Sequence, residues 1–167
     1  MDTPTEATTN TFEKINKVKQ LLSENPKVGV LIAPNFGIGA ILMMQFAKQA
    51  AAHFDSAEIM EFHHASKADA PSGTAARTAE LISKERKAKN KKAMPDATKT
   101  ALAGARGAKV GDVQIHSIRS DGDVAHQEVV FGSSGETLTI RHDSIDRAGY
   151  MPGVLLGIRE VTKNPGL

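Results

Sequence analysis

The start of the chain combines a polar stretch with a helical pattern. Residues 1–9 are polar and Thr-rich, so we expect a flexible lead-in there. Asn10 and Glu13 have the spacing of a capping box, and apolar residues then recur at helical spacing as far as Asn25. This pattern predicts an amphipathic helix that begins at Asn10 and is ended by Asn25-Pro26. Its apolar positions are Phe12, Ile15, Val18 and Leu22.

A continuous apolar run follows at residues 28–32, which is typical of a strand buried in a parallel sheet. Residues 38–54 are apolar nearly all round at first and gain polar residues later. They predict a helix that is deeply packed at its start and exposed at its end, with Met43 and Met44 as core filler. The first helix, the strand at residues 28–32 and the loop after it make half of an α/β unit.

Residues 58–62 predict a strand, and turn residues separate it from a helix over residues 73–86. That helix leads into a dense basic stretch at residues 84–92. Such a stretch could bind phosphate, but a solvated helix end and loop is the better interpretation. Residues 94–107 contain proline and glycine and are expected to form a loop.

Beyond Val110 the period of the apolar pattern changes to two, which is typical of strands. Three strands are predicted, and a hairpin turn at Gly132–Gly135 joins the last two. An antiparallel or mixed sheet follows, and Pro152 begins a final helix. The predicted strands are residues 113–118, 124–131 and 137–142.

The composition narrows the class of protein. A chain of 167 residues can hold one domain, or one domain with part of a second. With 21 basic and 19 acidic residues the net charge is only +2, which predicts neither a nucleic-acid surface nor a membrane face. Small molecules or copies of the chain itself are the expected partners.

The absence of cysteine excludes disulfides and thiolate metal sites, so any redox chemistry needs a cofactor. No signal peptide or membrane span is recognisable, and we expect a soluble, cytoplasmic protein.

Most groups able to do chemistry lie between residues 58 and 75. Adjacent histidines on an extended segment point to opposite sides, so His63 and His64 are expected to have different roles. A loop that closes over a ligand could bring Lys67 beside one imidazole and make it a usable proton donor. Gly73 and Thr74 open a helix whose first amides lack partners, which predicts a seat for a carboxylate or phosphate.

Each of these residues also has an ordinary structural explanation. A serine at position 72 is a normal N-cap, and a lone lysine or histidine is usually solvated or part of the core. By spacing alone, an enzyme and a binding protein both remain possible, and so does a general phosphate-binding protein.

Several other histidines and arginines are candidates for binding roles. His116, His126 and His142 fall in predicted strands, but they lack the spacing of a metal site and we expect no metal. Arg119 and Arg147 are candidates to pair with a second substrate carboxylate, or to hold a strand edge or a loop. Of the two, Arg147 is favoured as the substrate contact.

Residues 58–75 resemble the signature of the dihydrodipicolinate reductase family. The pattern E-x-x-E-x-H-x-x-x-K-x-D-x-P-S-G-T-A is matched at every fixed position. The resemblance continues in residues 28–36 upstream and in residues 126–142 and Arg147 downstream, and it covers roughly residues 8–167. It implies an enzyme of lysine and diaminopimelate synthesis that reduces 4-hydroxy-tetrahydrodipicolinate to tetrahydrodipicolinate with NADPH or NADH.

The resemblance also implies roles for single residues. It makes His63 the acid/base histidine and Lys67 the proton donor. The substrate contacts would be His64, Gly73 and Thr74. The main chain of the cofactor loop, formed by Ala33, Pro34, Asn35 and Phe36, would touch the nicotinamide end of the cofactor.

For the fold, the resemblance implies an α+β domain, a mixed open sheet packed with helices. Residues 37–167 would form the substrate-binding and oligomerisation domain, which builds a tetramer through its sheet. Residues 1–36 would form the lead-in and a remnant of a Rossmann-type α/β domain. The Gly-rich pyrophosphate loop of that domain is missing, since Gly37-Ile-Gly39 follows the wrong strand. The alternative is therefore a diacid-binding and self-assembly module without reductase activity of its own.

Overall fold

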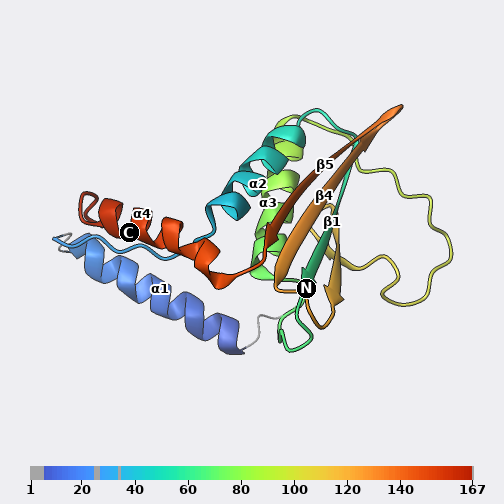
Figure 1. Cartoon of the computed structure of the whole chain (residues 1–167). Helices are drawn as coiled ribbons and strands as arrows, with labels where there is room; N and C mark the ends of the chain where they lie inside the picture. Colours follow the sequence, from blue (N-terminus) through green and yellow to red (C-terminus); the bar gives the residue numbers. More distant parts are fainter. Residues whose placement is uncertain (1–5, 25–26, 34, 167) are drawn as a thin grey trace. The chain divides into compact units, whose positions relative to one another are not determined.

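The computed structural model describes residues 6–24, 27–33 and 35–166, with the side chains from residue 13 onward (Figure 1). The chain divides into two compact units. One consists of Met1–Ala33 together with Gly153–Leu167, and the other of Pro34–Pro152. The C-terminal segment thus groups with the start of the chain, whereas the boundary predicted from the sequence lay between residues 36 and 37.

The unit of residues 34–152 is built on one mixed sheet of five strands in the order β2-β3-β1-β4-β5. β1 pairs in parallel with β3, and every other pair is antiparallel. The predicted mixed sheet, the three strands after Val110 and the hairpin are confirmed, while the short β2 was missed. The strands are β1 (Ser56–His63), β2 (Ala108–Val110), β3 (Val113–Arg119), β4 (Ala125–Ser133) and β5 (Glu136–Ser144).

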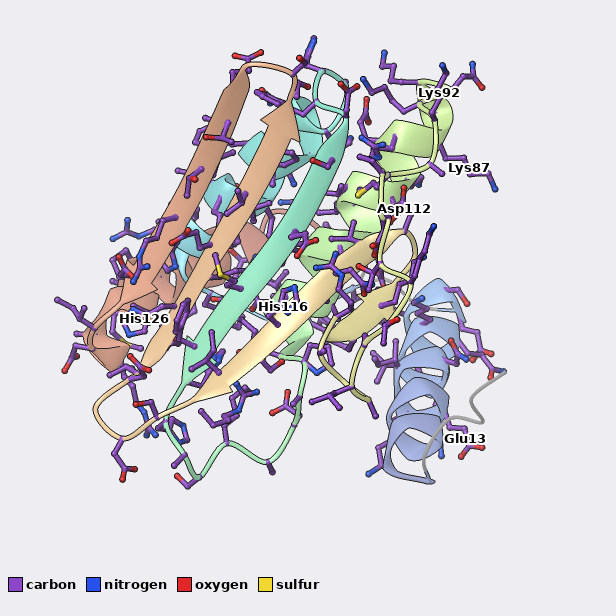
Figure 2. The ribbon with its side chains drawn as sticks, turned by 90° about the vertical axis from the view of Figure 1, so that its right-hand side faces the viewer. Glu13, Lys87, Lys92, Asp112, His116 and His126 are labelled. Carbon is purple, nitrogen blue, oxygen red and sulfur yellow. The ribbon has the colours of Figure 1, made fainter. Side chains whose placement is uncertain are left out.

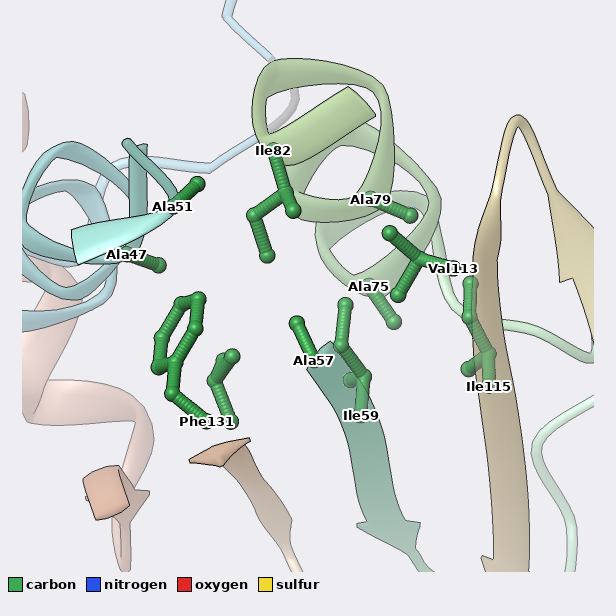
Figure 3. Close-up of a cluster of buried hydrophobic side chains, with 11 residues drawn as sticks. Ala47, Ala51, Ala57, Ile59, Ala75, Ala79, Ile82, Val113, Ile115 and Phe131 are labelled. Atoms are coloured by element: carbon green, nitrogen blue, oxygen red, sulfur yellow. The ribbon is translucent and has the colours of Figure 1, made fainter. Parts of the chain in front are cut away.

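Helices α2 (Ile38–Ala50) and α3 (Gly73–Ala88) lie on one face of this sheet (Figure 1). Alternate strand residues point toward them, so Ala57 and Ile59 of β1 are buried while their neighbours are half-exposed. Phe131 of β4 packs against Phe54 with ring centroids 5.6 Å apart. Small residues from both helices let them approach the sheet closely (Figure 3). The core consists of Ala47, Ala51, Ala57, Ile59, Ala75, Ala79, Ile82, Val113, Ile115, Val129 and Phe131.

The packing predicted for residues 38–54 is wrong in one respect. Met43 and Met44 are buried as expected, but Ile38 and Leu42 near the start of α2 are 39% and 46% exposed. A helix that lies on a sheet buries only one stripe of its surface, however apolar its other sides are. The helix also ends at Ala50, four residues before the predicted end.

One arginine of the basic stretch is buried, contrary to the prediction of a solvated run. Arg86 is 2% exposed, and its guanidinium donates to the carbonyls of Phe54 at 2.7 Å and of Asp55 and Lys92 at 2.9 Å each. It thereby joins the end of α3 to two loops. By contrast, Lys87 and Lys92 extend outward beside it (Figure 2).

The other compact unit contains α1 (Glu6–Glu24) and most of α4 (Met151–Val161), which follows a 3-10 turn at Arg147–Tyr150. The amphipathic helix and its end before Asn25 are confirmed. Its start is not, because the helix already includes Glu6 and Asn10 therefore lies inside it. Of the predicted lead-in, residues 1–5 lie outside the described residues and residues 6–9 are helical.

Residues 28–32 do not form the predicted strand. Among the described residues, their β-pairing is a single bridge between Gly29 and Gly166, and Val28, Leu31 and Ile32 are 50–60% exposed. A strand needs neighbours along its length to satisfy its amides, and the described part of the chain supplies just one pairing residue. A Rossmann-type remnant is therefore not confirmed. No helix among the described residues is both long and apolar enough to cross a membrane.

Candidate active site

A cavity of about 690 Å³ lies in the unit of residues 34–152, a size typical of sites for small molecules. Its walls come from the end of β1, the loop after it, the start of α3, β4 and β5. The lining residues are Asn35, Phe36, His63, His64, Lys67, Asp69, Ser72, Gly73, Thr74, Val124, Ala125, His126, Gln127, His142, Ser144, Arg147 and Tyr150.

The cavity brings together nearly all of the residues singled out in the sequence. Two predicted cofactor-loop residues are the exceptions. Ala33 belongs to the other compact unit and does not line the cavity, and Pro34 lies outside the described residues. The predicted residues that line the cavity are His63, Lys67, His64, Gly73, Thr74, Arg147, Asn35 and Phe36.

The first turn of α3 has the features of an anion seat. The Ser72 side chain caps the helix by accepting a hydrogen bond from the amide of Ala75 at 3.2 Å. The amides of Gly73 and Thr74 donate to no described residue. The space beside the Gly73 Cα is open, so a ligand can approach the main chain there. Two free amides at the positive end of a helix favour a carboxylate or phosphate.

The hydroxyl of Thr74 is oriented by Asn35. The amide of Gly37 donates to Asn35 Oδ1 at 2.7 Å, which identifies that atom as the acceptor. The other end of the side chain, Nδ2, is then a donor, and it lies 3.0 Å from Thr74 Oγ1. Because Thr74 Oγ1 accepts this bond, its own proton is free to bind a ligand oxygen. Asn35 thus ties the predicted cofactor loop to the anion seat.

His63 lies at the end of β1 and is mostly buried, with 15% of its side chain exposed. Its Nδ1 lies 2.5 Å from Oε2 of Glu61, a fully buried carboxylate. Burial lowers the pKa of His63 below its ordinary value and outweighs the opposing effect of Glu61. Burial also opposes ionisation of Glu61, but hydrogen bonds led by those from Arg119 hold the pKa of this carboxyl below its ordinary value.

The loop after β1 carries the predicted proton donor. Lys67 is 20% exposed, and its Nζ lies 2.5 Å from Oδ1 of the mostly exposed Asp69. Burial is the main cause that lowers the pKa of His63, and the charge of Lys67 is a smaller one. His64 is exposed, and its Nδ1 contacts Ser66 Oγ at 2.8 Å. The two adjacent histidines therefore have different surroundings.

The two arginines that are candidates for a substrate contact, Arg119 and Arg147, have different surroundings in the structure. Arg119 donates to both oxygens of Glu61 and to the carbonyl of Asp69, so the two terminal nitrogens of its guanidinium are engaged within the protein. Arg147 lines the cavity, and no described carboxylate forms an ion pair with it. Of these two arginines, Arg147 is the one that lines the cavity.

Several polar residues that line the cavity had no predicted role in substrate binding, among them His126, Gln127, His142 and Tyr150. His126 Nδ1 lies 2.8 Å from Asp143 Oδ1, and burial lowers the pKa of His142. His126 lies at the start of β4, and Figure 2 shows it well apart from His116 on β3. The strand pairing that brings β4 and β5 beside β1 has no local signal, so sequence reasoning could not assign these residues to the site. Within the described ranges, no group of three or more His, Asp or Glu side chains could hold a metal ion.

Comparison with known proteins identifies what this chain is similar to. A family model described as "Dihydrodipicolinate reductase, C-terminus" matches residues 39–167. The 4-hydroxy-tetrahydrodipicolinate reductase of Mycolicibacterium gilvum is 61% identical over 157 residues, which are 94% of this chain and 63% of that protein. The reductase of Nocardia farcinica is 60% identical over 92% of this chain and 62% of its own length.

A solved structure, the dipicolinate-bound dihydrodipicolinate reductase from Paenisporosarcina sp. TG-14, superposes with a TM-score of 0.76 at 44% identity. The match covers 93% of this chain and 57% of that one. The chain therefore spans somewhat less than two thirds of the curated relatives it matches.

Proposed function

This chain belongs to the dihydrodipicolinate reductase family, and we propose that it is the substrate-binding part of a 4-hydroxy-tetrahydrodipicolinate reductase. Such an enzyme would reduce 4-hydroxy-tetrahydrodipicolinate with NADPH or NADH in lysine and diaminopimelate synthesis. Residues 37–167 would form its substrate-binding and oligomerisation domain. The observation that carries the proposal is a single cavity that combines an anion seat with His63 and Lys67.

The substrate class follows from the donors in the cavity. The free amides of Gly73 and Thr74, with the Thr74 hydroxyl, suit one carboxylate. Arg147 and His64 line the same cavity and suit a second. The similar Paenisporosarcina reductase binds dipicolinate, a planar dicarboxylate, which supports the same class of ligand here.

The proton chemistry is assigned to His63 and Lys67. Reduction of an unsaturated ring needs a proton delivered to the carbon beside the one that receives hydride. Lys67, which lines the cavity and is held by Asp69 before the ligand binds, would donate that proton when the substrate carboxylates draw its ammonium group away from Asp69. His63 would act as the acid/base partner, because burial weakens its hold on a proton.

The cofactor would supply hydride, and its nicotinamide end would be held by the loop containing Asn35 and Phe36. This fits the geometry, because Asn35 already bonds to Thr74 and so places the loop beside the anion seat. The described residues include no Gly-rich loop that could bind the pyrophosphate. We therefore expect weak binding of the dinucleotide to this chain alone.

The face of the sheet away from α2 and α3 is proposed to mediate self-association. In the unit of residues 34–152 no helix covers this face, and it presents Met60, Phe62 and Val130 half-buried. A tetramer would bury these side chains. Light scattering after size exclusion would then give about four times the 17.8 kDa chain mass.

A second candidate is a diacid-binding and self-assembly module that holds no cofactor. The absence of a pyrophosphate loop among the described residues favours it. Calorimetric titration with pyridine-2,6-dicarboxylate, with and without NADPH, separates the two functions. Binding strengthened by NADPH supports the reductase, and binding indifferent to NADPH supports the module. No binding of the diacid refutes the proposed substrate site.

Variants of Lys67 test the proposed mechanism in any active assembly of this chain. We expect Lys67→Ala to abolish turnover and to leave diacid binding weakened but detectable. Lys91→Ala is a matched control, because Lys91 forms a similar ion pair with Asp55 outside the cavity. Unchanged turnover in Lys67→Ala would remove this residue from the mechanism.

A further inference from the structure

Glu61 is a buried charged side chain beside the cavity for which the proposed chemistry has so far no role. It is fully buried in β1, the central strand of the sheet. It lies two residues before His63, so both side chains project from the same face of the strand. A carboxylate is costly to bury unless hydrogen bonds satisfy it, and here they do.

Four contacts satisfy the two oxygens of Glu61. Arg119 donates to Oε2 at 3.0 Å and to Oε1 at 2.9 Å. The amide of Ser72 donates to Oε1 at 3.3 Å, and His63 Nδ1 lies 2.5 Å from Oε2. An ionised carboxylate can only accept, so the proton of this last bond belongs to His63 Nδ1. The bond therefore selects one of the two tautomers of the neutral imidazole.

The other nitrogen of His63 is left for the cavity. No described residue forms a hydrogen bond with Nε2, and His63 lines the cavity. With Nδ1 protonated, Nε2 carries the lone pair that can take up a proton and later release it. The opposite tautomer would place the lone pair against the Glu61 carboxylate, where two acceptors would repel each other.

Arg119 extends this arrangement to the loop that carries Lys67. Besides both oxygens of Glu61, its guanidinium donates to the carbonyl of Asp69 at 2.7 Å. Asp69 in turn holds Lys67 through its carboxylate. The Glu61–Arg119 pair thus connects the imidazole on β1 to the loop of the proposed proton donor.

We propose that Glu61 is a positioning residue that holds His63 in the Nδ1-protonated form, with Nε2 available to a ligand, and that fixes the Lys67 loop through Arg119. The catalytic purpose of this arrangement rests on the proposed function. The tautomer itself does not, because it follows from contacts within the protein.

The test is NMR of the whole chain with 15N-labelled histidine, in which long-range couplings distinguish the two ring nitrogens. In the unmodified chain at pH 8 we expect the Nδ1-protonated tautomer of His63 to exceed the other by at least about tenfold, as a charge-assisted bond provides. A dominant Nε2-protonated tautomer would overturn the proposal without any variant.

The variant Glu61→Gln tests whether the Glu61 carboxylate is what selects the tautomer of His63. The amide can offer an N–H to Nδ1, so we expect the tautomer preference to be lost or reversed. We also expect the pH midpoint of His63 to fall, because the carboxylate raises its pKa. Glu58→Gln is the matched control: Glu58 lies on the same strand, bonds to His116 at 2.8 Å and should leave His63 unchanged. An unchanged tautomer in a folded Glu61→Gln chain refutes the role of Glu61.

Titration of the same samples with pyridine-2,6-dicarboxylate distinguishes a failure of the proposed function from a failure of the proposed role of Glu61. A chain with the expected tautomer that does not bind the diacid contradicts the proposed function and leaves the positioning role intact. A chain that binds the diacid with the opposite tautomer contradicts the positioning role alone. If Glu61→Gln fails to fold, Glu61→Asp keeps the charge with a shorter reach and should weaken the tautomer preference.

Discussion

Replacing Arg86 with methionine should destabilise the fold markedly, although Arg86 lies in a stretch that looks like a solvated basic run. Methionine keeps the apolar stem and removes the guanidinium. The carbonyls of Phe54, Asp55 and Lys92 then lose their donors. An acceptor left unsatisfied inside a protein costs about 1–3 kcal/mol, and these carbonyls belong to partly exposed segments, so the lower value applies to each. The expected loss is about 3 kcal/mol of the free energy of unfolding.

The ion pair of Arg86 with Asp112 adds little to this loss, because the two groups are 3.4 Å apart and Asp112 is 37% exposed. Urea unfolding followed by far-UV circular dichroism measures the effect, which should appear as a lower midpoint with an unchanged slope. Arg77→Met on the same helix is the control, since Arg77 is 54% exposed and pairs only with Glu80 among the described residues. It should cost no more than about 0.5 kcal/mol. A similar small loss in both variants would refute the structural role of Arg86.

Three further predictions concern the pH dependence of stability, the anion seat and two glycines of the loop before β2. Burial lowers the pKa of His63 and of His142 below 6.5, so the unfolded chain binds more protons. The free energy of unfolding should fall as pH drops through about 6.5 toward 5, and a flat or rising profile would contradict this. Thr74→Val should weaken binding of pyridine-2,6-dicarboxylate about tenfold while Thr74→Ser retains it, and equal affinities would exclude the hydroxyl as a donor. Gly104→Ala has open space and should cost about 1 kcal/mol for its positive φ. Gly107→Ala should cost clearly more in urea unfolding, because its Cβ would also overlap a main-chain carbonyl of β3.

Much of the local structure near the site could be predicted from the sequence. The strand before His63, the N-cap at Ser72 and the helix from Gly73 depend on periodicity and capping within a few residues. For the same reason, the hairpin between β4 and β5 was predicted correctly, although its turn at residues 134–135 is shorter than the predicted turn at residues 132–135. These features need no information from distant parts of the chain.

The local sequence pattern gave wrong predictions where the solvent exposure of a residue or the pairing of a strand depends on distant segments of the chain. The apolar run at residues 28–32 satisfies every sequence criterion for a buried strand, yet it finds only one pairing residue in the described chain. Arg86 has the charge of a surface residue, but it donates hydrogen bonds to carbonyls that lie 32 and 31 residues earlier and 6 residues later in the chain. Whether a given residue is buried depends on how the whole chain packs, and the residue type indicates only how often such residues are buried in proteins.

The sequence by itself determined that His63, Lys67 and the start of α3 lie close together, because they belong to one short segment of the chain. The tertiary structure alone decided how those groups are held. Arg119, 58 residues after Glu61, reaches it because β3 pairs in parallel with β1, and His142 reaches the cavity because β5 follows β4 across the sheet. Strand order has no local code, since it results from long-range pairing that buries the apolar face of the sheet against two helices.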